Sequence, residues 1–415
     1  AVWKKLSAIF ASEEKNLLFA VFHGAGETAA EIGIKHKSFM PILHPVFILI
    51  FLFLAFASYW EIFRLEKKQS IFVWVTAILI IIAIGFRINV GADYPVYKML
   101  FSGFAIYTTY GDVLDKALFR PNSEEIEWIF VLINKLVFDF GLPFYIVTLI
   151  MAVIAVSLKF TAIYKNVAFP TIAMLFYFMP IMFFEDSGQM RQGLGIAVCV
   201  ASFKFIKERN LFMFLLCIYI ALGFHKTAIV FLPAYWIVKI PMNSTRIFWV
   251  LVIALLSSPF ELYRLGSDFF GSIAPQDISG AYTGYMDDRY YGTEVETGLN
   301  DLVKIIFIAI LIRYDKKGCE EVWWYEYMRN LAVFGMALFY FFRSNEIFAV
   351  RLPGAYMFFV TMFCLSNLVY AVKGSGRQML YLGFMMYFVA MFFYFGSGNA
   401  HRGGFTTERY QNALW

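Results

Sequence analysis

Twelve long apolar stretches follow one another along most of the chain, each separated from the next by a polar segment. A membrane-spanning helix needs about 20 apolar residues, and close packing or tilt in a bundle accommodates shorter ones. No internal repeat and no soluble domain interrupts this pattern. The pattern predicts an all-α fold, a polytopic membrane bundle of about twelve transmembrane helices, at residues 41–60, 71–86, 142–158, 168–184, 192–206, 210–224, 226–238, 246–260, 299–312, 328–342, 348–370 and 378–396.

Composition supports a membrane protein and excludes several other classes. Hydrophobic types make up 60% of the 415 residues and charged types only 16%, against about 25% charged in ordinary soluble domains. This balance excludes a soluble globule, a disordered chain and a disulfide scaffold. The four cysteines form neither a CxxC pair nor a zinc spacing, so we expect no metal and no cofactor. A net charge of +5 is too small to indicate a nucleic-acid partner.

Basic residues mark which side of the membrane each loop faces. Compact basic loops follow the odd-numbered helices, and the positive-inside rule makes that side cytoplasmic. The opposite side then receives both termini and the long loops 87–141 and 261–298. Counting Glu125–Phe140 as a span would break the alternation, so we predict an interfacial or re-entrant helix there. The basic loops are Arg64/Lys67/Lys68, Lys159/Lys165, Lys204/Lys207/Arg209, Lys239/Arg246, Arg313/Lys316/Lys317 and Lys373/Arg377.

The first 39 residues do not fit this topology. They carry several lysines and a Gly24–Gly26 break, and a basic tail of this length is awkward to translocate. Met40-Pro41 opens the first apolar run directly. Our hypothesis is that residues 1–39 are a non-native extension or a flexible N-terminal segment, and that residues 40–415 form a single integral membrane domain.

Scarce polar residues concentrate at the predicted outer ends of the helices. Each has an ordinary explanation: an arginine can snorkel or pair with a carboxylate, tyrosines can join an aromatic belt, and Gly193 can permit close helix packing. Taken together, however, arginines and lysines occupy the side that they normally avoid. Some can pair with neighbouring carboxylates, and a bound anion can supply the remaining partners. Because the arginine fork grips phosphate through paired hydrogen bonds, the pattern indicates a lipid-linked phosphate substrate.

Three short motifs carry a resemblance. They read Arg87-x-x-x-Gly91-x-Asp93-Tyr94-x-x-Tyr97, Met190-Arg191-Gln192-Gly193-Leu194 and Phe224-His225-Lys226-Thr227-Ala228, and Glu346-Ile-Phe-Ala-Val-Arg351 follows. In this order, over about residues 40–396, they resemble the EpsG family of Wzy-like polysaccharide polymerases. Met40 resembles the start of such proteins, whereas residues 1–39 do not.

The resemblance implies a multi-pass glycosyltransferase of the bacterial cytoplasmic (inner) membrane whose active site faces the periplasm or exterior. Such enzymes join oligosaccharide repeat units carried on undecaprenyl diphosphate into exopolysaccharide, capsule or O-antigen. The growing chain moves from its lipid to a lipid-linked acceptor. The fold is GT-C-like by analogy only. The expected partners are the polyprenyl-diphosphate-linked oligosaccharide and the lipid bilayer, with a chain-length regulator and a flippase as further candidates.

This reaction assigns candidate roles to the outer residues. The leaving diphosphate needs stabilised charge and the acceptor hydroxyl benefits from a base. His225 is the first candidate base because its ordinary pKa is closest to working pH, and Asp93, Glu185 and Glu346 are rivals. Tyr94 and Tyr97 can stack on a sugar, and Gln192 can hydrogen-bond it. The loop 261–298 suits a lid, with a disordered loop as the alternative. The candidate diphosphate ligands are Arg87, Arg191, Arg343, Arg351 and Lys226.

Three other functions share parts of this pattern. An O-antigen ligase-type glycosyltransferase uses the same donor with a different acceptor, and only the motif order favours a polymerase. A lipid-linked oligosaccharide flippase or other transporter calls for charges at mid-membrane depth and often for inverted repeats. A membrane O-acyltransferase calls for a donor site that often faces the cytoplasm. The predicted topology places the polar clusters at outer helix ends, which favours transfer of a lipid-linked sugar on the outer face.

Overall fold

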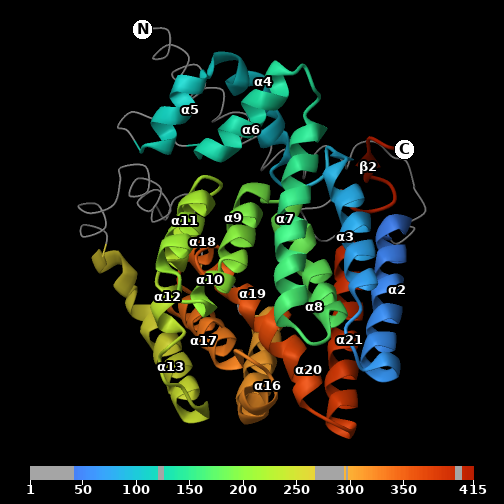
Figure 1. The fold of residues 1–415 in the computed structure, drawn as a ribbon, viewed down its shortest axis with the longest axis vertical. Helices are drawn as coiled ribbons and strands as arrows, with labels where there is room; N and C mark the ends of the chain where they lie inside the picture. The colour runs from blue at the N-terminus through green and yellow to red at the C-terminus, as the bar shows by residue number, and fades with distance from the viewer. Residues whose placement is uncertain (1–41, 120–125, 267–293, 296–297, 398–403) are drawn as a thin grey trace, which may run out of the picture. The chain divides into compact units, whose positions relative to one another are not determined.

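The computed structural model describes residues 42–119, 126–266, 294–295, 298–397 and 404–415, which are almost entirely helical (Figure 1). The residues 1–39 and most of the predicted lid 261–298 lie outside these ranges. The first half of the chain forms α2 (Pro45–Trp60) with the π-helical turn η1 (Glu61–Leu65), α3 (Ser70–Gly85), β1 (Arg87–Ile88), α4 (Tyr94–Tyr107), α5 (Tyr110–Ala117), α6 (Trp128–Asp139), α7 (Tyr145–Asn166), α8 (Pro170–Phe176) with η2 (Tyr177–Asp186), α9 (Met190–Ala201), α10 (Phe203–Lys207) and α11 (Leu211–Leu222).

The second half continues the helical pattern. The elements are η3 (Lys226–Phe231), α12 (Ala234–Ile237), α13 (Ser244–Ser257), η4 (Ser258–Phe260), η5 (Leu262–Gly266), α16 (Leu299–Glu321), α17 (Tyr325–Phe341), α18 (Glu346–Arg351), α19 (Gly354–Phe358) with η6 (Phe359–Leu365) and α20 (Ser366–Ala371), α21 (Ser375–Gly396) and β2 (Gln411–Asn412). Each of the twelve predicted ranges contains helix, so the all-α prediction is confirmed.

Four helices in the described ranges are long and apolar enough to cross a membrane, which supports the prediction of a membrane protein. They are Pro45–Leu65, Tyr145–Asn166, Gly354–Ala371 and Ser375–Gly396. Shorter apolar helices cover Ser70–Gly85, Leu211–Leu222, Lys226–Ile237 and Ser244–Phe260. The count of twelve spans and the GT-C-like arrangement stay predictions.

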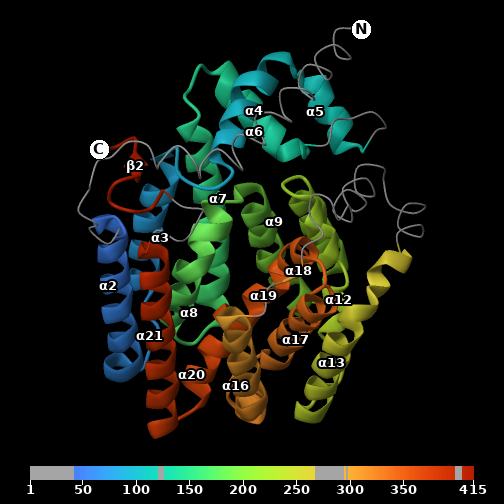
Figure 2. The ribbon, with the colours of Figure 1, turned by 180° about the vertical axis from the view of Figure 1, so that it is seen from behind.

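The helices pack as a bundle in which α3 lies along α7, α7 along α9, and α13 along α17 (Figure 2). The apolar runs form helices because they hold few breakers, and Pro180 is an exception. Its ring removes a backbone donor, and Met179 before it leaves the helical region (φ −124°, ψ 107°), which breaks the helix inside η2. The chain therefore reaches Asp186 as an irregular segment inside the bundle.

The helix α7 is longer than predicted, and this corrects one basic loop. The range 142–158 was expected to end before Lys159, but α7 continues to Asn166. Lys159 therefore lies seven residues inside the helix, about 10 Å from its end at 1.5 Å per residue. Its side chain is fully buried, so Lys159 does not belong to a surface loop.

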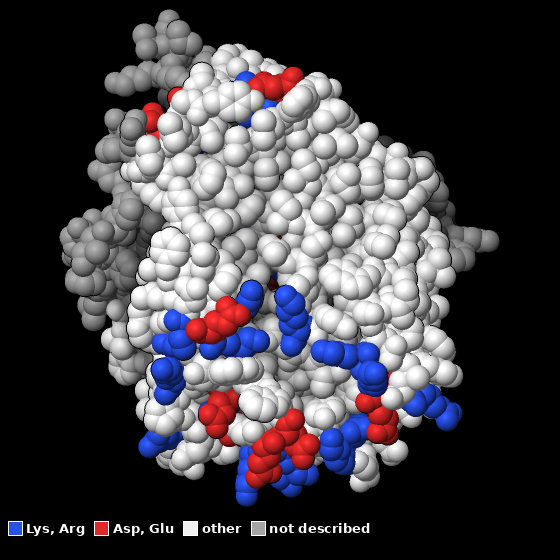
Figure 3. Space-filling model, viewed as in Figure 1, with Lys and Arg blue, Asp and Glu red and all other residues white. Residues whose placement is uncertain are grey.

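The remaining basic loops meet at one end of the bundle. Lys68 Nζ donates to the carbonyl of Tyr164 (3.1 Å), and Lys207 Nζ donates to Asn166 Oδ1 (2.6 Å). Lys373 pairs with Glu321 at 3.6 Å. Figure 3 shows Lys, Arg, Asp and Glu gathered toward the lower part of one face, below a broad uncharged band. These contacts support the predicted alternation of loops.

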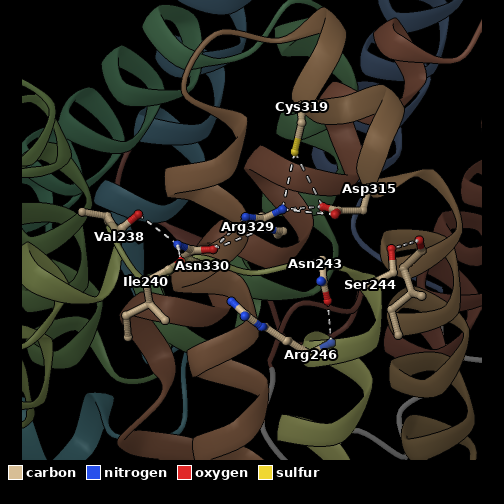
Figure 4. A network of polar contacts seen from close by, with 10 residues as sticks. Val238, Ile240, Asn243, Ser244, Arg246, Asp315, Cys319, Arg329 and Asn330 are labelled. Carbon is tan, nitrogen blue, oxygen red and sulfur yellow. Dashed lines mark hydrogen bonds and ion pairs between the residues drawn. The ribbon is translucent and has the colours of Figure 1, made fainter.

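A buried polar network lies near this basic end and joins α16, α17 and the segment between α12 and α13 (Figure 4). Arg329 donates to both oxygens of Asp315 at 3.1 Å. Asn330 Nδ2 donates to the carbonyls of Val238 (2.9 Å) and Ile240 (2.8 Å). The network satisfies backbone groups that a tight connection would otherwise leave unpaired.

At the other end, α4, α5 and α6 form a layer beyond the ends of α9 and α11 and beside the upper end of α7 (Figures 1 and 2). Ile129 N in α6 donates to the carbonyl of Gly223 (2.9 Å), and the Tyr219 hydroxyl in α11 donates to the carbonyl of Ala117 (2.9 Å). The predicted segment Glu125–Phe140 is therefore a helix over most of its length. Its interfacial or re-entrant placement stays a prediction.

Candidate functional site

The site is built around the start of α9, where Met190, Arg191 and Gln192 emerge from the turn after η2. Two motif glycines allow this approach. A Cβ on Gly193 would collide with the carboxylate of Asp186, and one on Gly91 would collide with the backbone carbonyl of Ser187. Gly91 also has a φ of +106°, which side-chain-bearing residues rarely adopt. The first two motifs of the sequence therefore meet at this turn.

Arg191 pairs with a carboxylate that sequence reasoning missed. Its Nη1 lies 2.7 Å from Glu127 Oε2, and its guanidinium lies 5.5 Å from the ring centres of Tyr97 and Phe130. The Nε of Arg191 is buried without a hydrogen-bond partner among the described residues. This arrangement fixes the arginine plane and leaves one donor direction for another acceptor.

Glu127 connects the layer of α4, α5 and α6 to the site. It is 8% exposed, and its Oε1 accepts a hydrogen bond from the backbone nitrogen of Lys226 (3.2 Å). One carboxylate therefore joins the first turns of α9 and η3. The sequence contains only a weak indication of this role for Glu127, since it is an acidic residue near the start of the amphipathic segment Glu125–Phe140.

His225 lies beside the same charges, but its surroundings make it a weak base. Its Nδ1 accepts from Thr227 N (3.3 Å) and lies 2.7 Å from Thr227 Oγ1, which assigns the ring proton to Nε2. Burial, and then nearby Arg191, Arg351 and Lys226 against the opposing charge of Glu127, lowers the pKa of His225 to about 4. At neutral pH the ring is neutral and presents an Nε2–H donor.

Gln192 contacts the motif that ends at Arg351 and so joins it to the group around Arg191. Its Nε2 donates to the backbone carbonyl of Arg351 (3.2 Å), and its side chain is nearly fully buried. The Oε1 of Gln192 has no hydrogen-bond partner among the described residues. Three separate parts of the sequence therefore gather at one end of the bundle near Glu127, and they contribute Arg191 and Gln192, His225 and Lys226, and Arg351.

Arg87 is adjacent to this cluster but its guanidinium is committed to protein atoms. It is 1% exposed, donates from Nε to the carbonyl of Val90 (3.1 Å) and from Nη1 to the carbonyl of Ile84, and Nη2 lies 3.7 Å from Met190 Sδ. Burial lowers the pKa of Arg87 to about 10. Its contacts resemble those of a helix-capping residue more than those of an exposed phosphate ligand.

The two motif tyrosines are also buried. Tyr94 packs edge-on against Phe144 with ring centres 5.2 Å apart, and Tyr97 packs against Phe130 at 5.5 Å. The Tyr97 hydroxyl donates to Asp93 Oδ2 (3.3 Å). Tyr97 therefore bridges Asp93 and Arg191, and both rings are packed against phenylalanines rather than presenting an open face.

Glu185 and Asp186 meet Lys159 inside the bundle instead of forming a solvated loop. Lys159 Nζ lies 2.7 Å from Asp186 Oδ1 and 3.6 Å from Glu185 Oε2. The Tyr177 hydroxyl donates to Asp186 Oδ2 (2.5 Å). This buried group anchors the segment that leads into α9, one turn before Arg191.

The remaining predicted residues have other surroundings. Arg343 forms a two-pronged ion pair with Asp301, with both nitrogen–oxygen distances 2.8 Å, and also donates to the carbonyl of Val295 (3.4 Å). Glu346 lies exposed in the first turn of α18. No group of three or more His, Cys, Asp or Glu side chains that can hold a metal occurs within the described ranges.

Comparison with known proteins gives one match. The model of the EpsG family matches residues 70–412, which cover all of the motifs discussed above and most of the chain. The chain matches none of the curated proteins and none of the solved structures with which it was compared.

Proposed function

This chain belongs to the EpsG family, and on that premise we propose that it polymerises polyprenyl-diphosphate-linked oligosaccharide repeat units. The family suggests an exopolysaccharide-related polymerase with glycosyltransferase activity in a membrane. The proposal adds the substrate and the direction of transfer, from a lipid-linked chain to a lipid-linked acceptor on the outer face of the bacterial inner membrane. The meeting of the basic loops at the opposite end of the bundle supports this orientation.

The observation that carries the proposal is the convergence of Arg191, Lys226 and Arg351 around a neutral histidine. Three cationic residues come from α9, η3 and α18, and Glu127 is the acidic residue whose contacts tie the first two together. A diphosphate leaving group develops negative charge as the glycosidic bond breaks, and prearranged cations stabilise that charge in a site shielded from water. We assign Arg191 and Arg351 to the diphosphate, with Lys226 in support.

The same geometry revises the base. Because His225 holds its proton on Nε2, we assign it to donate a hydrogen bond to a phosphate or sugar oxygen. Asp93, held by the Tyr97 hydroxyl beside Arg191, is then our preferred base for the acceptor hydroxyl. The unpartnered Oε1 of Gln192 is suited to accept from a sugar hydroxyl.

We give the other predicted residues supporting roles. Arg87 and Arg343 already bind protein acceptors, so we assign them to hold α3 and α16 rather than to grip the diphosphate. Glu185 joins the anchor at Lys159, and Glu346, exposed in the first turn of α18, stays a rival base. Tyr94 and Tyr97 support the site by packing.

One observation favours a second candidate. Lys159 and Asp186 place two paired charges inside the bundle, which is a feature expected of a transporter. The sequence did not predict this pair. A lipid-linked oligosaccharide flippase is therefore the alternative to the polymerase.

Polymer length in cells tests the site. A strain that lacks this gene is complemented with the wild type, Arg191→Ala, His225→Ala and the control Lys204→Ala, an exposed lysine of α10. On a polysaccharide gel, the wild type and Lys204→Ala should give long polymer, and the two site variants should give mainly single repeat units. Full-length polymer from Arg191→Ala and His225→Ala at normal expression would exclude this assignment.

A further inference from the structure

A short segment near the end of the sequence covers the outer end of α3. Residues 404–415, here called the C-terminal strap, form β2, which pairs antiparallel with β1 and sets Arg87 opposite Asn412. The strap also binds the start of α2, since His44 N donates to the carbonyl of Phe405 (2.9 Å) and Thr407 N to that of Ile42 (2.9 Å). Phe405, Tyr410 and Asn412 are all buried.

The strap supplies hydrogen bonds that the end of a helix lacks. The last carbonyls of an α-helix have no partner within the helix, and burying them unpaired costs stability. The Tyr410 hydroxyl donates to the carbonyl of Ala83 (2.6 Å), Asn412 Nδ2 to that of Ile82 (3.1 Å), and Ala413 N to that of Phe86 (2.8 Å). Asn412 Nδ2 also lies 2.9 Å from the Tyr410 hydroxyl, so the donors form one unit.

Arg87 and α7 complete the same cap. Arg87 Nη1 donates to the carbonyl of Ile84, and Thr148 Oγ1 donates to that of Gly85 (2.6 Å). Every carbonyl from Ile82 to Phe86 therefore accepts a hydrogen bond, and three of the five come from the strap. The strap and Arg87 act together on one helix end.

This helix end touches the turn that leads to Arg191. Arg87 Nη2 contacts Met190 Sδ, and the chain after β1 brings Gly91 against the backbone of Ser187. Phe405 of the strap packs edge-on against Phe183 in η2, with ring centres 4.8 Å apart. The strap thus packs on η2, which leads into the turn before α9, and pairs with β1, whose Arg87 contacts the first residue of α9.

We propose that the C-terminal strap is a positioning element of the site: it caps α3 together with Arg87 and so fixes the turn at Ser187 that presents Arg191. The catalytic consequence rests on the proposed function, whereas the positioning itself does not. Tyr410 and Asn412 are positioning residues, because they act on Arg191 through α3 and the turn.

Thiol labelling measures the positioning directly. Ser187 is 1% exposed, so the near-isosteric variant S187C places a buried thiol in the turn. Purified S187C protein in micelles is treated with a maleimide, and the rate at each cysteine is followed by peptide mass spectrometry. The native Cys319, which lies near the opposite end beside Arg329, reports general unfolding in the same sample. The strap is altered by Tyr410→Phe, by Asn412→Ala or by deletion of residues 404–415, and Glu408→Gln changes an exposed strap residue as the control.

The expected result is at least tenfold faster labelling at position 187 in Asn412→Ala and in the deletion, with a smaller increase in Tyr410→Phe. The rate at Cys319 and the Glu408→Gln control should stay unchanged. Polymer assembly by the same strap variants should fall in parallel. Unchanged labelling at position 187 in the deletion overturns the proposal, as does an equal rise at both cysteines, which means general destabilisation. Faster labelling at position 187 without polymer assembly by the wild type leaves the strap in place and contradicts the proposed function instead.

Discussion

The buried ion pair between Lys159 and Asp186 permits a quantitative prediction about what holds the site. The side chains are 0% and 1% exposed, and Nζ and Oδ1 lie 2.7 Å apart. In Lys159→Met the carboxylate of Asp186 keeps, among the residues that the structure describes, the hydroxyl of Tyr177 as its one strong donor. Breaking a buried pair by removing one partner costs about 3–5 kcal/mol, because the remaining charge is left uncompensated.

The reverse change and the double variant separate charge from packing. In Asp186→Asn, Lys159 retains Glu185 at 3.6 Å, so we expect a smaller cost of about 2 kcal/mol, typical of a lost hydrogen bond to a charged group. The double variant Lys159→Met/Asp186→Asn removes both charges. Its cost should fall below the sum of the single costs by about 0.5–3 kcal/mol, the range of coupling between contacting residues.

Unfolding by sodium dodecyl sulfate in mixed micelles, followed by tryptophan fluorescence, measures these free energies. Lys204→Met on α10 is the control, because its side chain is 57% exposed and such substitutions change stability by less than about 0.5 kcal/mol. A Lys159→Met protein as stable as this control would refute the reasoning. Strictly additive costs in the double variant would do the same.

Four further predictions follow from individual contacts. Glu127→Gln should shorten the polymer on gels nearly as much as Arg191→Ala, because the arginine loses its charged partner, whereas Glu208→Gln in an exposed pair should not. Burial lowers the pKa of His225 from 6.5 to about 4, so the stability that the neutral ring contributes is complete above about pH 6.5 and is lost as the pH falls toward 4. The unfolding midpoint of the wild type should therefore drop between pH 6.5 and about pH 4 more than that of His225→Gln. Gly193→Ala should unfold at a lower temperature than the wild type because its methyl group meets Asp186, while Gly383→Ala in α21, which meets nothing within 4 Å, should be neutral or stabilising. Asn330→Ala, far from the site, should lower the melting temperature without changing polymer length per folded protein, and shortened polymer at equal folded protein would contradict its structural role.

Local sequence patterns predicted the helices better than their ends. An apolar run predicts a helix because the run itself supplies the side chains that the helix buries in the bundle or inserts into the membrane. Every predicted range contains helix. The predicted end of α7 was wrong because the local sequence around Lys159 is typical of a basic loop. Its partners Asp186 and Glu185 are 27 and 26 positions away, and no local pattern announces that they meet.

The sequence predicted those site residues that belong to the short motifs and contact one another. Arg191, Gln192 and His225 were singled out as costly polar residues at helix ends, and they do lie together. Glu127 and the C-terminal strap were missed because their roles depend on pairing with distant backbone and side-chain groups. Arg87 was singled out for its charge, but its guanidinium donates to the backbone carbonyls of Val90 and Ile84.

Reconstitution tests the central claim most directly. Purified protein in liposomes is given a polyprenyl-diphosphate-linked repeat unit, and the products are separated by length. We predict a ladder of lengthened lipid-linked chains with the wild type and Lys204→Ala, and unextended units with Arg191→Ala. Repeat units that cross the bilayer unchanged, with no ladder from the wild type, would contradict polymerisation and favour the flippase.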